Sequence, residues 1–336
     1  MTKGRFVSAA DVARQAGVSR SAVSRTFTPG ACVSALVRSR VEAAARDLGY
    51  HVNRMARSLH LPQSPLVGVI GANLSSAYIA AQLDALSAAL LREGLHCLLV
   101  NTASDATAPL QMLLEYRVRA VVMLSGAAPE HLVAECAANG VRMVLINRPA
   151  PSGPADLIEA DSAAGGRLAA DRLLQAGCRD VAVIRSGSRT SAKLARAEAF
   201  IARMQASGCA TRVWDQGPNG YDTGVAAARQ LLPDSGLDGA FGVTDDIALG
   251  FLNTARHELG IDVPGRLSVI GFDDNPAGAW ISHRLTTIRQ PIDALTDATI
   301  RALLNPDPAP LHIPVAVELV ERGSVAPAPP APSVQG

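Results

Sequence analysis

Two arginines and a group of hydroxyls near the N-terminus have the chemistry to contact nucleic acid. The residues are Arg20, Ser21 and Arg25, with further hydroxyls at Ser19, Ser24, Thr28 and Ser34. Arginine donates two parallel hydrogen bonds to the O6 and N7 atoms of guanine, and this pairing distinguishes one base from another. Hydroxyls suit phosphate oxygens. We therefore predict that Arg20, Ser21 and Arg25 face base edges and that the other hydroxyls face phosphates.

A second group of polar residues follows apolar runs that have the character of buried strands. The group consists of Ser75-Ser76-Ala77-Tyr78, Asn147-Arg148, Arg196, Asp245-Asp246 and Asp273-Asp274. Carboxylates accept hydrogen bonds from hydroxyls, arginine donates them, and an aromatic ring can cover the apolar face of a sugar. Each residue alone would also suit a strand-end cap or a surface ion pair. Because the whole group lies at strand ends, it favours a binding site for a polyhydroxylated ligand.

Signatures of catalysis and of metal or cofactor binding are missing from the sequence. It contains no G-x-S-x-G, H-E-x-x-H, Walker A or G-x-G-x-x-G pattern, and Gly165-Gly166 lies inside a helical pattern. The seven histidines show no metal-ligand spacing, and none of the five cysteines forms a C-x-x-C pair. The two Asp-Asp pairs could in principle act as acid and base. We nevertheless predict a protein that is not an enzyme and uses no cofactor or metal.

The composition is that of a globular chain with an uneven distribution of charge. The 336 residues are 48% hydrophobic and 18% charged, with a formal net charge of +1. Residues 1–65 contain ten Lys/Arg and three Asp/Glu, a charge of +7, whereas the remainder contains 21 and 27, a charge of −6. A cationic head suggests binding to a polyanion, although a solvated basic face without a partner would have the same composition. With no signal peptide and no apolar run near the ~18 residues of a membrane span, a cytoplasmic location is expected.

N-capping serines and glycines predict three short helices in the head. They run from Ser8 to Gly17, from Ser19 to about Thr28 and from Ser34 to about Leu48. The first begins with a capping box in which aspartate replaces the usual glutamate. A helix, a tight glycine turn and a second helix form the arrangement that places a recognition helix in the major groove of DNA.

The rest of the chain alternates short apolar runs with alanine-rich amphipathic segments. The apolar runs are 66–70, 95–100, 120–124, 143–146, 181–184, 239–243 and 267–270. Such alternation gives parallel sheets with helices on both faces, an α/β fold. We predict two lobes of this kind, which divide at about residues 147–154 and rejoin near residues 286–291. Ligands bind beyond the carboxyl ends of the strands in these sheets, so the two lobes would form a hinged cleft.

Several segments of the chain resemble one protein family. In the head they are Asp11-Val12-Ala13, Ala16-Gly17-Val18-Ser19, Val23-Ser24-Arg25, Leu48-Gly49-Tyr50 and Ala56-Arg57-Ser58-Leu59, and in the body Val243–Gly250, Gly271–Asp274, Leu285–Pro291 and Glu318–Ser324. The combination is similar to the lactose-repressor/galactose-repressor (LacI/GalR) family of bacterial transcription regulators. The resemblance implies a helix-turn-helix domain and a hinge helix, then two lobes of doubly wound parallel sheet like those of periplasmic binding proteins.

The resemblance implies further DNA contacts beyond the head. Residues from Asn53 to Leu59 match the family's hinge helix. Leu59 matches a leucine that wedges into the minor groove and kinks the duplex, and Arg57 would lie beside it in the groove. Val52 departs from the proline that is usual at the entry to this hinge.

The resemblance also adds to the effector site. The residues assigned to this site are Ser76, Tyr78, Asn147, Arg148, Arg196, Asn219, Asp245 and Asp273. Asp245 stands where the family usually has asparagine. Its charge disfavours an anionic ligand, whereas Arg148 and Arg196 favour one, and the sequence leaves this question open.

The predicted function is that of a DNA-binding transcriptional repressor controlled by a sugar or sugar derivative. Two chains would pair as a homodimer on an approximately palindromic operator in the bacterial cytoplasm. The predicted domains are a helix-turn-helix domain (1–51), a hinge helix and linker (52–65), an effector-binding and dimerisation domain (66–325) and a disordered tail (326–336). A solute-binding protein would instead have a signal peptide and no basic head, and a sugar-modifying enzyme would turn its ligand over.

Overall fold

The computed structural model describes residues 6–28, 30–52, 64–102, 106–188, 190–233 and 235–328. The chain divides into two units, a head (Met1–Ser64) and a body (Pro65–Gly336). This boundary falls inside the predicted linker of residues 52–65. The predicted hinge residues Asn53, Arg57 and Leu59 lie outside the described residues, as do residues 329–336 of the predicted tail.

The head consists of three helices close to the positions that the capping residues predict. They are α1 (Ala9–Ala16), α2 (Arg20–Thr26) and α3 (Ala35–Leu48). Ser8 forms the predicted capping box with Asp11. The second helix ends before the predicted Thr28, where Phe27 turns toward the ring of Tyr50 and the two centroids lie 5.8 Å apart.

A small apolar core holds these three helices together. Its buried members are Val12, Ala13, Ala16, Val23, Val41, Ala44 and Ala45. Val23 is only 1% exposed, which agrees with its predicted inward position. The opposite face of α2 is therefore open to solvent, and it carries Arg20, Ser21, Ser24 and Arg25.

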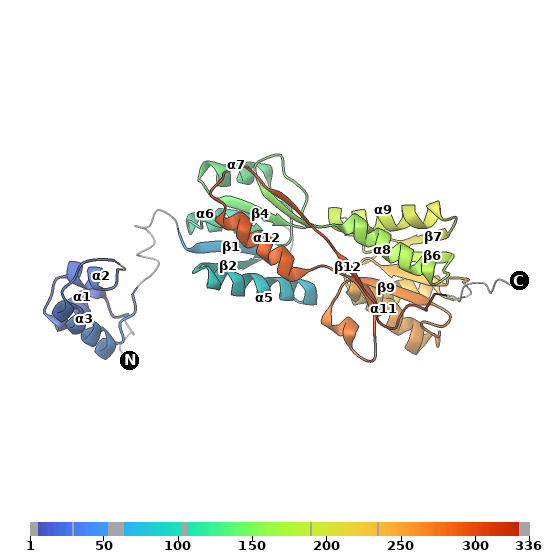
Figure 1. Cartoon of the computed structure of the whole chain (residues 1–336), viewed down its shortest axis with the longest axis horizontal. Coiled ribbons are helices and arrows are strands. Elements are labelled where there is room, and N and C mark those ends of the chain that lie inside the picture. Colours follow the sequence, from blue (N-terminus) through green and yellow to red (C-terminus); the bar gives the residue numbers. More distant parts are fainter. Residues whose placement is uncertain are drawn as a thin grey trace, which may run out of the picture. The chain divides into compact units, whose positions relative to one another are not determined.

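The first lobe of the body is a parallel sheet with helices on both faces (Figure 1). In spatial order its strands are β11 (His312–Val315), β5 (Asp156–Ala160), β4 (Arg142–Ile146), β3 (Ala120–Met123), β1 (Leu66–Gly71) and β2 (His96–Asn101). Its helices are α5 (Ala77–Arg92), α6 (Thr107–Glu115), α7 (Glu130–Ala138) and α12 (Ile292–Leu304). Val144 packs with α5 and α12, whereas its neighbour Leu145 packs with α6 and α7. Successive side chains of a strand thus fill the layers on opposite faces of the sheet.

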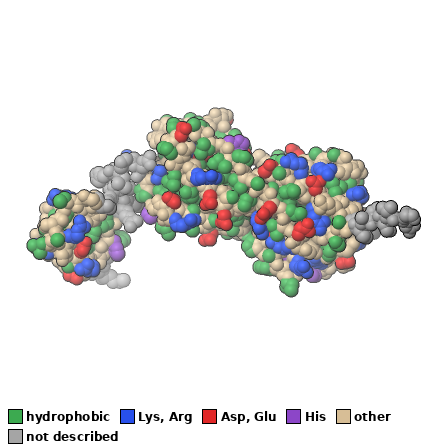
Figure 2. All heavy atoms as spheres, in the orientation of Figure 1, with side chains coloured by type: hydrophobic (Ala, Val, Ile, Leu, Met, Phe, Trp, Pro, Cys, Tyr) green, Lys and Arg blue, Asp and Glu red, His purple; other side chains and the backbone are tan. Residues whose placement is uncertain are grey.

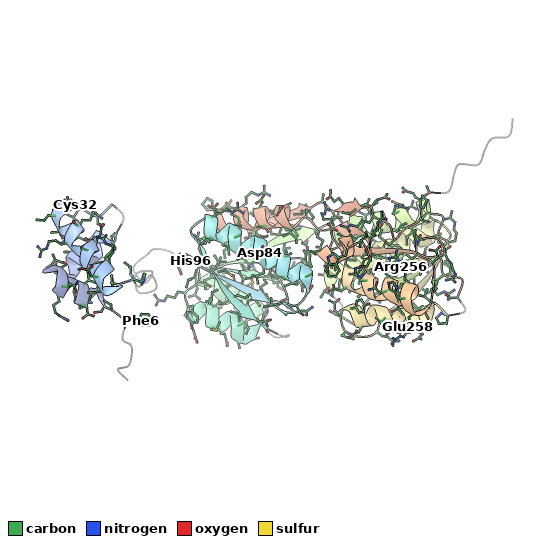
Figure 3. The ribbon with its side chains drawn as sticks, turned by 90° about the horizontal axis from the view of Figure 1, so that it is seen from below. Phe6, Cys32, Asp84, His96, Arg256 and Glu258 are labelled. Carbon is green, nitrogen blue, oxygen red and sulfur yellow. The ribbon has the colours of Figure 1, made fainter. Side chains whose placement is uncertain are left out.

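The second lobe repeats this architecture. Its strands, in spatial order, are β12 (Glu318–Val320), β10 (Thr286–Arg289), β9 (Ser268–Asp273), β8 (Gly239–Gly242), β6 (Asp180–Ile184) and β7 (Ala210–Trp214). All neighbours are parallel except β12, which runs antiparallel to β10. The helices are α8 (Ser162–Gln175), α9 (Ser191–Ala206), α10 (Tyr221–Leu231) and α11 (Asp245–Asn253), and a π-helical turn follows α11 at Thr254–Glu258. Figure 3 shows Arg256 and Glu258 of this turn in the second lobe and Asp84 and His96 in the first.

Three segments connect the lobes. The chain passes from β5 to α8, returns from β10 to α12, and crosses again from β11 to β12. The return lies near residues 286–291, as the sequence predicts. The predicted division at residues 147–154 is wrong, because β5 still belongs to the first sheet and the chain leaves it at Asp161. The third crossing was not predicted, because β11 and β12 are short and partly exposed.

The surface of the body carries charges of both signs. Acidic and basic side chains are interspersed over the visible face of both lobes (Figure 2). Among the described helices, none is both long enough and apolar enough to cross a membrane.

Candidate functional site

The exposed face of α2 and the turn that follows it bring together half of the residues predicted to contact DNA. Arg20, Ser21, Ser24 and Thr28 help to line one hollow of about 960 Å³. The Thr28 hydroxyl donates a hydrogen bond of 2.8 Å to the carbonyl of Ser24. Arg25 is exposed on the same helix, and its Nε atom donates to the carbonyl of Ser21 at 3.4 Å. Within the described head, neither Arg20 nor Arg25 forms an ion pair, so both guanidinium groups are available to bases.

Ser19 and Ser34 cap helices in this structure. The Ser19 hydroxyl accepts a hydrogen bond from the backbone nitrogen of Ala22 at 3.2 Å, and the Ser34 hydroxyl accepts one from that of Val37 at 3.4 Å. Both residues are also exposed. Contact between these two hydroxyls and phosphate remains a prediction.

In the body, Arg196 and Asp273 form the centre of a buried polar cluster. Arg196 lies on α9 and is 3% exposed, and Asp273 is the last residue of β9. The Nη1 atom of Arg196 lies 3.4 Å from Oδ1 of Asp273 and donates to the carbonyl of Val243 at 3.0 Å. The guanidinium also lies over the ring of Phe272, 3.5 Å from its centroid. Burial raises the pKa of Asp273 to about 6 while Arg196 opposes this rise, so the carboxylate is largely ionised at neutral pH.

Gln290 joins this pair to the first lobe. Its Nε2 atom donates to Oδ1 of Asp273 at 2.6 Å. Its Oε1 atom accepts from Nδ2 of Asn147 at 2.9 Å and from the hydroxyl of Tyr78 at 3.1 Å. Asn147 follows β4 and Tyr78 lies in the first turn of α5, both in the first lobe. A continuous chain of hydrogen bonds therefore runs between the lobes, from Arg196 to Tyr78.

Local backbone geometry explains how these side chains meet. Asn147 has a φ of 54° and Asp273 a φ of 127°, values that few residues other than glycine adopt. The side-chain oxygen of Asn147 accepts from the backbone nitrogen of Ala160 at 2.8 Å, which leaves the amide NH₂ to face Gln290. Close packing of α8 on α9 also helps to position Arg196. Gly166 of α8 permits this packing, because any larger side chain at that position would collide with the carbonyl oxygen of Arg196.

Two further cations border the cluster. The Nζ atom of Lys193 donates to Oδ1 of Asn219 at 2.7 Å, and burial lowers the pKa of Lys193 to about 8. Arg148 directly follows Asn147, and burial lowers its pKa as well. Among the described residues, the Arg148 guanidinium donates only to the carbonyl of Ile146, at 3.4 Å.

Asp245 and Ser76 have a less direct relation to the cluster. Asp245 is fully buried, and its two oxygens accept hydrogen bonds from the Thr287 hydroxyl at 2.5 Å and from the Asn275 backbone nitrogen at 2.6 Å. Burial, with a smaller contribution from Asp273, raises the pKa of Asp245 to about 8, so this side chain is mostly protonated at neutral pH. Ser76 precedes α5, and its hydroxyl forms no capping bond. Ligand contact by either residue remains a prediction.

Lys193 and Gln290 belong to the cluster but were not predicted to be site residues. Lys193 lies three positions before Arg196, a spacing that places two side chains on the same face of a helix. Gln290 directly follows β10, just as the predicted candidates follow their strands. Both signals are present in the sequence. In the described part of the chain, no group of His, Cys, Asp and Glu is arranged to hold a metal ion.

Two family models match the chain. Residues 9–53 match the bacterial regulatory proteins of the lacI family, and residues 170–325 match a periplasmic binding protein-like domain. The first range contains α2 of the head, and the second begins within α8 and covers the rest of the second lobe together with α12 and β11 of the first.

Relatives and solved structures match over nearly the full length. The HTH-type transcriptional regulator GalS of Salmonella typhimurium is 31% identical over 94% of this chain and 96% of its own. The HTH-type transcriptional regulator MalR of Streptomyces coelicolor is 32% identical over 95% and 97%. A lac repressor dimer bound to operator and the anti-inducer ONPF has a TM-score of 0.84 at 24% identity, covering 96% of this chain and 100% of that one. A complex of the transcriptional regulator CelR with cellobiose has a TM-score of 0.69 at 25% identity, covering 95% and 99%.

The head and body together define a helix-turn-helix regulator with a two-lobed receptor. The chain belongs to the lacI family of bacterial regulatory proteins. It is a DNA-binding regulator of transcription, as the sequence predicts.

Proposed function

We propose that the chain is an operator-binding repressor whose DNA affinity is controlled by a sugar or sugar derivative held between the lobes of the body. The observation that carries this proposal is the chain of hydrogen bonds from Arg196 through Asp273 and Gln290 to Asn147 and Tyr78. It presents acceptors, donors and an aromatic ring at the carboxyl ends of strands, where α/β sheets bind ligands. These groups bind the hydroxyls and the apolar face of a sugar.

The same hydrogen bonds offer a route from ligand to DNA. A ligand hydroxyl that replaces the bond between Gln290 and Asp273 would change the link between the two lobes. To act as an effector, the ligand must bind one arrangement of the lobes more tightly, with a coupling free energy of about 1–3 kcal/mol. An inducer would prefer the arrangement that is incompatible with operator binding.

Similar proteins support the sugar and the dimer. CelR was solved with cellobiose, and the lac repressor was solved as a dimer on its operator. In the proposal two chains pair through their bodies and place two heads on an approximate palindrome. Residues 1–51 contact DNA, residues 52–65 form the hinge and linker, and residues 66–325 bind the effector and the second chain. The protein acts by binding rather than by catalysis, in the bacterial cytoplasm where the DNA lies.

A selection experiment with full-length protein tests this proposal. Genomic DNA fragments are selected at low ionic strength, with and without each of a panel of sugars and sugar derivatives. We expect enrichment of one palindromic sequence, a steep loss of affinity with salt because phosphate contacts dominate, and an effect of about tenfold from at least one compound. A fragment pool without sequence enrichment, or an operator affinity that no compound changes, would contradict the proposal.

A further inference from the structure

Three cationic side chains converge on the polar cluster of the body. Arg196 lies at its centre, Lys193 lies one turn earlier on α9, and Arg148 follows β4. Lys193 is within electrostatic reach of both arginines. Two carboxylates face these cations, those of Asp246 and Asp273.

These carboxylates leave part of the positive charge unpaired. Asp273 lies 3.4 Å from Arg196. Lys193 donates to the neutral side chain of Asn219, and Arg148 donates to a backbone carbonyl. In the described part of the chain, neither Lys193 nor Arg148 contacts a carboxylate at ion-pair distance.

Asp245 does not supply the missing negative charge. It is fully buried, and both of its oxygens accept hydrogen bonds within the second lobe, from Thr287 and Asn275. Burial keeps its carboxyl group largely protonated at neutral pH, with a pKa of about 8. An ionised Asp245, in place of the family's usual asparagine, would disfavour an anionic ligand. Because Asp245 is largely protonated, it adds little negative charge to the cluster.

The cluster also contains a cationic donor without an acceptor. The Nε atom of Arg196 is buried and has no hydrogen-bond partner among the described residues, and the whole residue is 3% exposed. A buried polar group without a partner is unfavourable, and a buried charge without a counter-charge more so. Burial likewise lowers the pKa values of Lys193 and Arg148.

We propose that the effector is a sugar acid, whose carboxylate binds Lys193 and Arg148 while its hydroxyls bind Asp273 and Asn147. This inference rests on the proposed function and names its ligand class. Three cations face the two carboxylates of Asp246 and Asp273, which leaves a surplus of positive charge that one ligand carboxylate balances. A phosphate monoester carries a charge of about −1.5 to −2 at neutral pH and would more than neutralise the surplus positive charge of the cluster. The planar guanidinium of Arg148 also suits a carboxylate, which it can bind through two parallel hydrogen bonds.

Matched ligands test the inference on the full-length protein without DNA. Isothermal titration calorimetry compares D-glucose, D-gluconate, D-glucuronate and D-glucose 6-phosphate, and then the corresponding galactose series. We expect at least one acid to bind tenfold or more tightly than its neutral parent sugar and than its phosphate ester. Tighter binding of a phosphate ester would overturn the carboxylate assignment. Equal or tighter binding of the neutral sugars, or no binding of any acid at 10 mM, would overturn the inference altogether.

Charge-removing variants locate the carboxylate. Lys193→Met and Arg148→Gln should each reduce the affinity for the preferred acid about tenfold or more, and by a larger factor than the affinity for the neutral sugar. Arg167→Gln, which alters an exposed arginine on α8, is the matched control and should change neither affinity. An unchanged ratio of acid to neutral affinity in both test variants would overturn the assigned residues. Operator binding by the same preparations, measured with and without the acid, reports on the proposed function separately.

Discussion

The amide of Gln290 donates a hydrogen bond of 2.6 Å to the carboxylate of Asp273. The same amide accepts a bond of 2.9 Å from Asn147 in the first lobe. Gln290 lies in the segment that returns from β10 to α12, so it is part of a covalent connection between the lobes as well as of the polar cluster. A ligand that competes for Asp273 would therefore act directly on the link between the lobes.

Replacement of Gln290 by methionine should weaken both the fold and the allosteric response. Gln290→Met keeps the length of the side chain but removes the three hydrogen bonds to Asp273, Asn147 and Tyr78. It leaves buried partners unsatisfied, which costs about 1–3 kcal/mol. We expect the free energy of unfolding in urea to fall by about this amount. We also expect the ratio of operator affinities without and with effector, measured by anisotropy titration, to approach one. The control is Gln175→Met, at an exposed position at the end of α8. Wild-type values of both quantities in Gln290→Met would argue against a linking role.

Asp245 should make the stability of the body depend on pH. Its pKa is raised by burial to about 8 in the folded chain, against about 3.9 in an unfolded one. The folded state therefore holds a proton that the unfolded state releases. The resulting stability is complete below about pH 4 and is lost as pH rises toward 8.

Asp245→Asn should remove this dependence. An amide cannot ionise, yet it can accept from the Asn275 nitrogen and donate to the Thr287 hydroxyl. At pH 8.5 we expect the free energy of unfolding of the variant to exceed that of the wild type by on the order of 2 kcal/mol or more, and its unfolding temperature to be higher. Both differences should narrow toward pH 5. The control is Asp84→Asn, because Asp84 is exposed on α5 (Figure 3). Parallel pH profiles of Asp245→Asn and wild type would contradict the assigned protonation.

Local signals made the head more predictable than the body. Ser8, Ser19 and Ser34 cap helices through contacts within three residues, so their helices could be placed from sequence alone. The strand β5 was missed because acidic residues interrupt its apolar pattern. The structure explains one of them, since Asp156 forms a bidentate ion pair with Arg142 of the neighbouring strand. Such a pairing depends on the tertiary fold and has no local signature.

The effector cluster could likewise be predicted from the sequence only in part. Tyr78, Asn147, Arg196 and Asp273 were predicted as strand-end candidates or by family resemblance, and the fold brings all four together. The bridging role of Gln290 requires knowledge of where the chain crosses between the lobes. The protonation of Asp245 likewise depends on burial, which its sequence position does not reveal.

Asp273 should be required for the effector response and dispensable for DNA binding. Asp273→Asn keeps the size of the side chain but removes the charge that accepts hydrogen bonds from ligand hydroxyls, and charged hydrogen bonds contribute about 1.5–3 kcal/mol. We expect effector affinity to fall tenfold or more in calorimetry. Operator affinity without effector should stay within about twofold, because Asp273 belongs to the body and the residues predicted to contact DNA belong to the head. Normal effector affinity in this variant would remove Asp273 from the site.

Arg20 and Arg25 should determine which base pairs the head prefers. Both are exposed on α2 opposite the buried Val23, and neither pairs with a carboxylate in the described head. If they donate to guanine, Arg20→Ala and Arg25→Ala should each relax the preference at one position of each half-site by about 1–3 kcal/mol. Loss of an arginine that contacts only phosphate would instead weaken binding to all sequences alike and reduce the salt dependence. Arg46→Ala, at an exposed position of α3, is the comparison. A randomised-site selection measures these preferences, and if both α2 variants select the wild-type sequence with undiminished stringency, base reading must lie elsewhere.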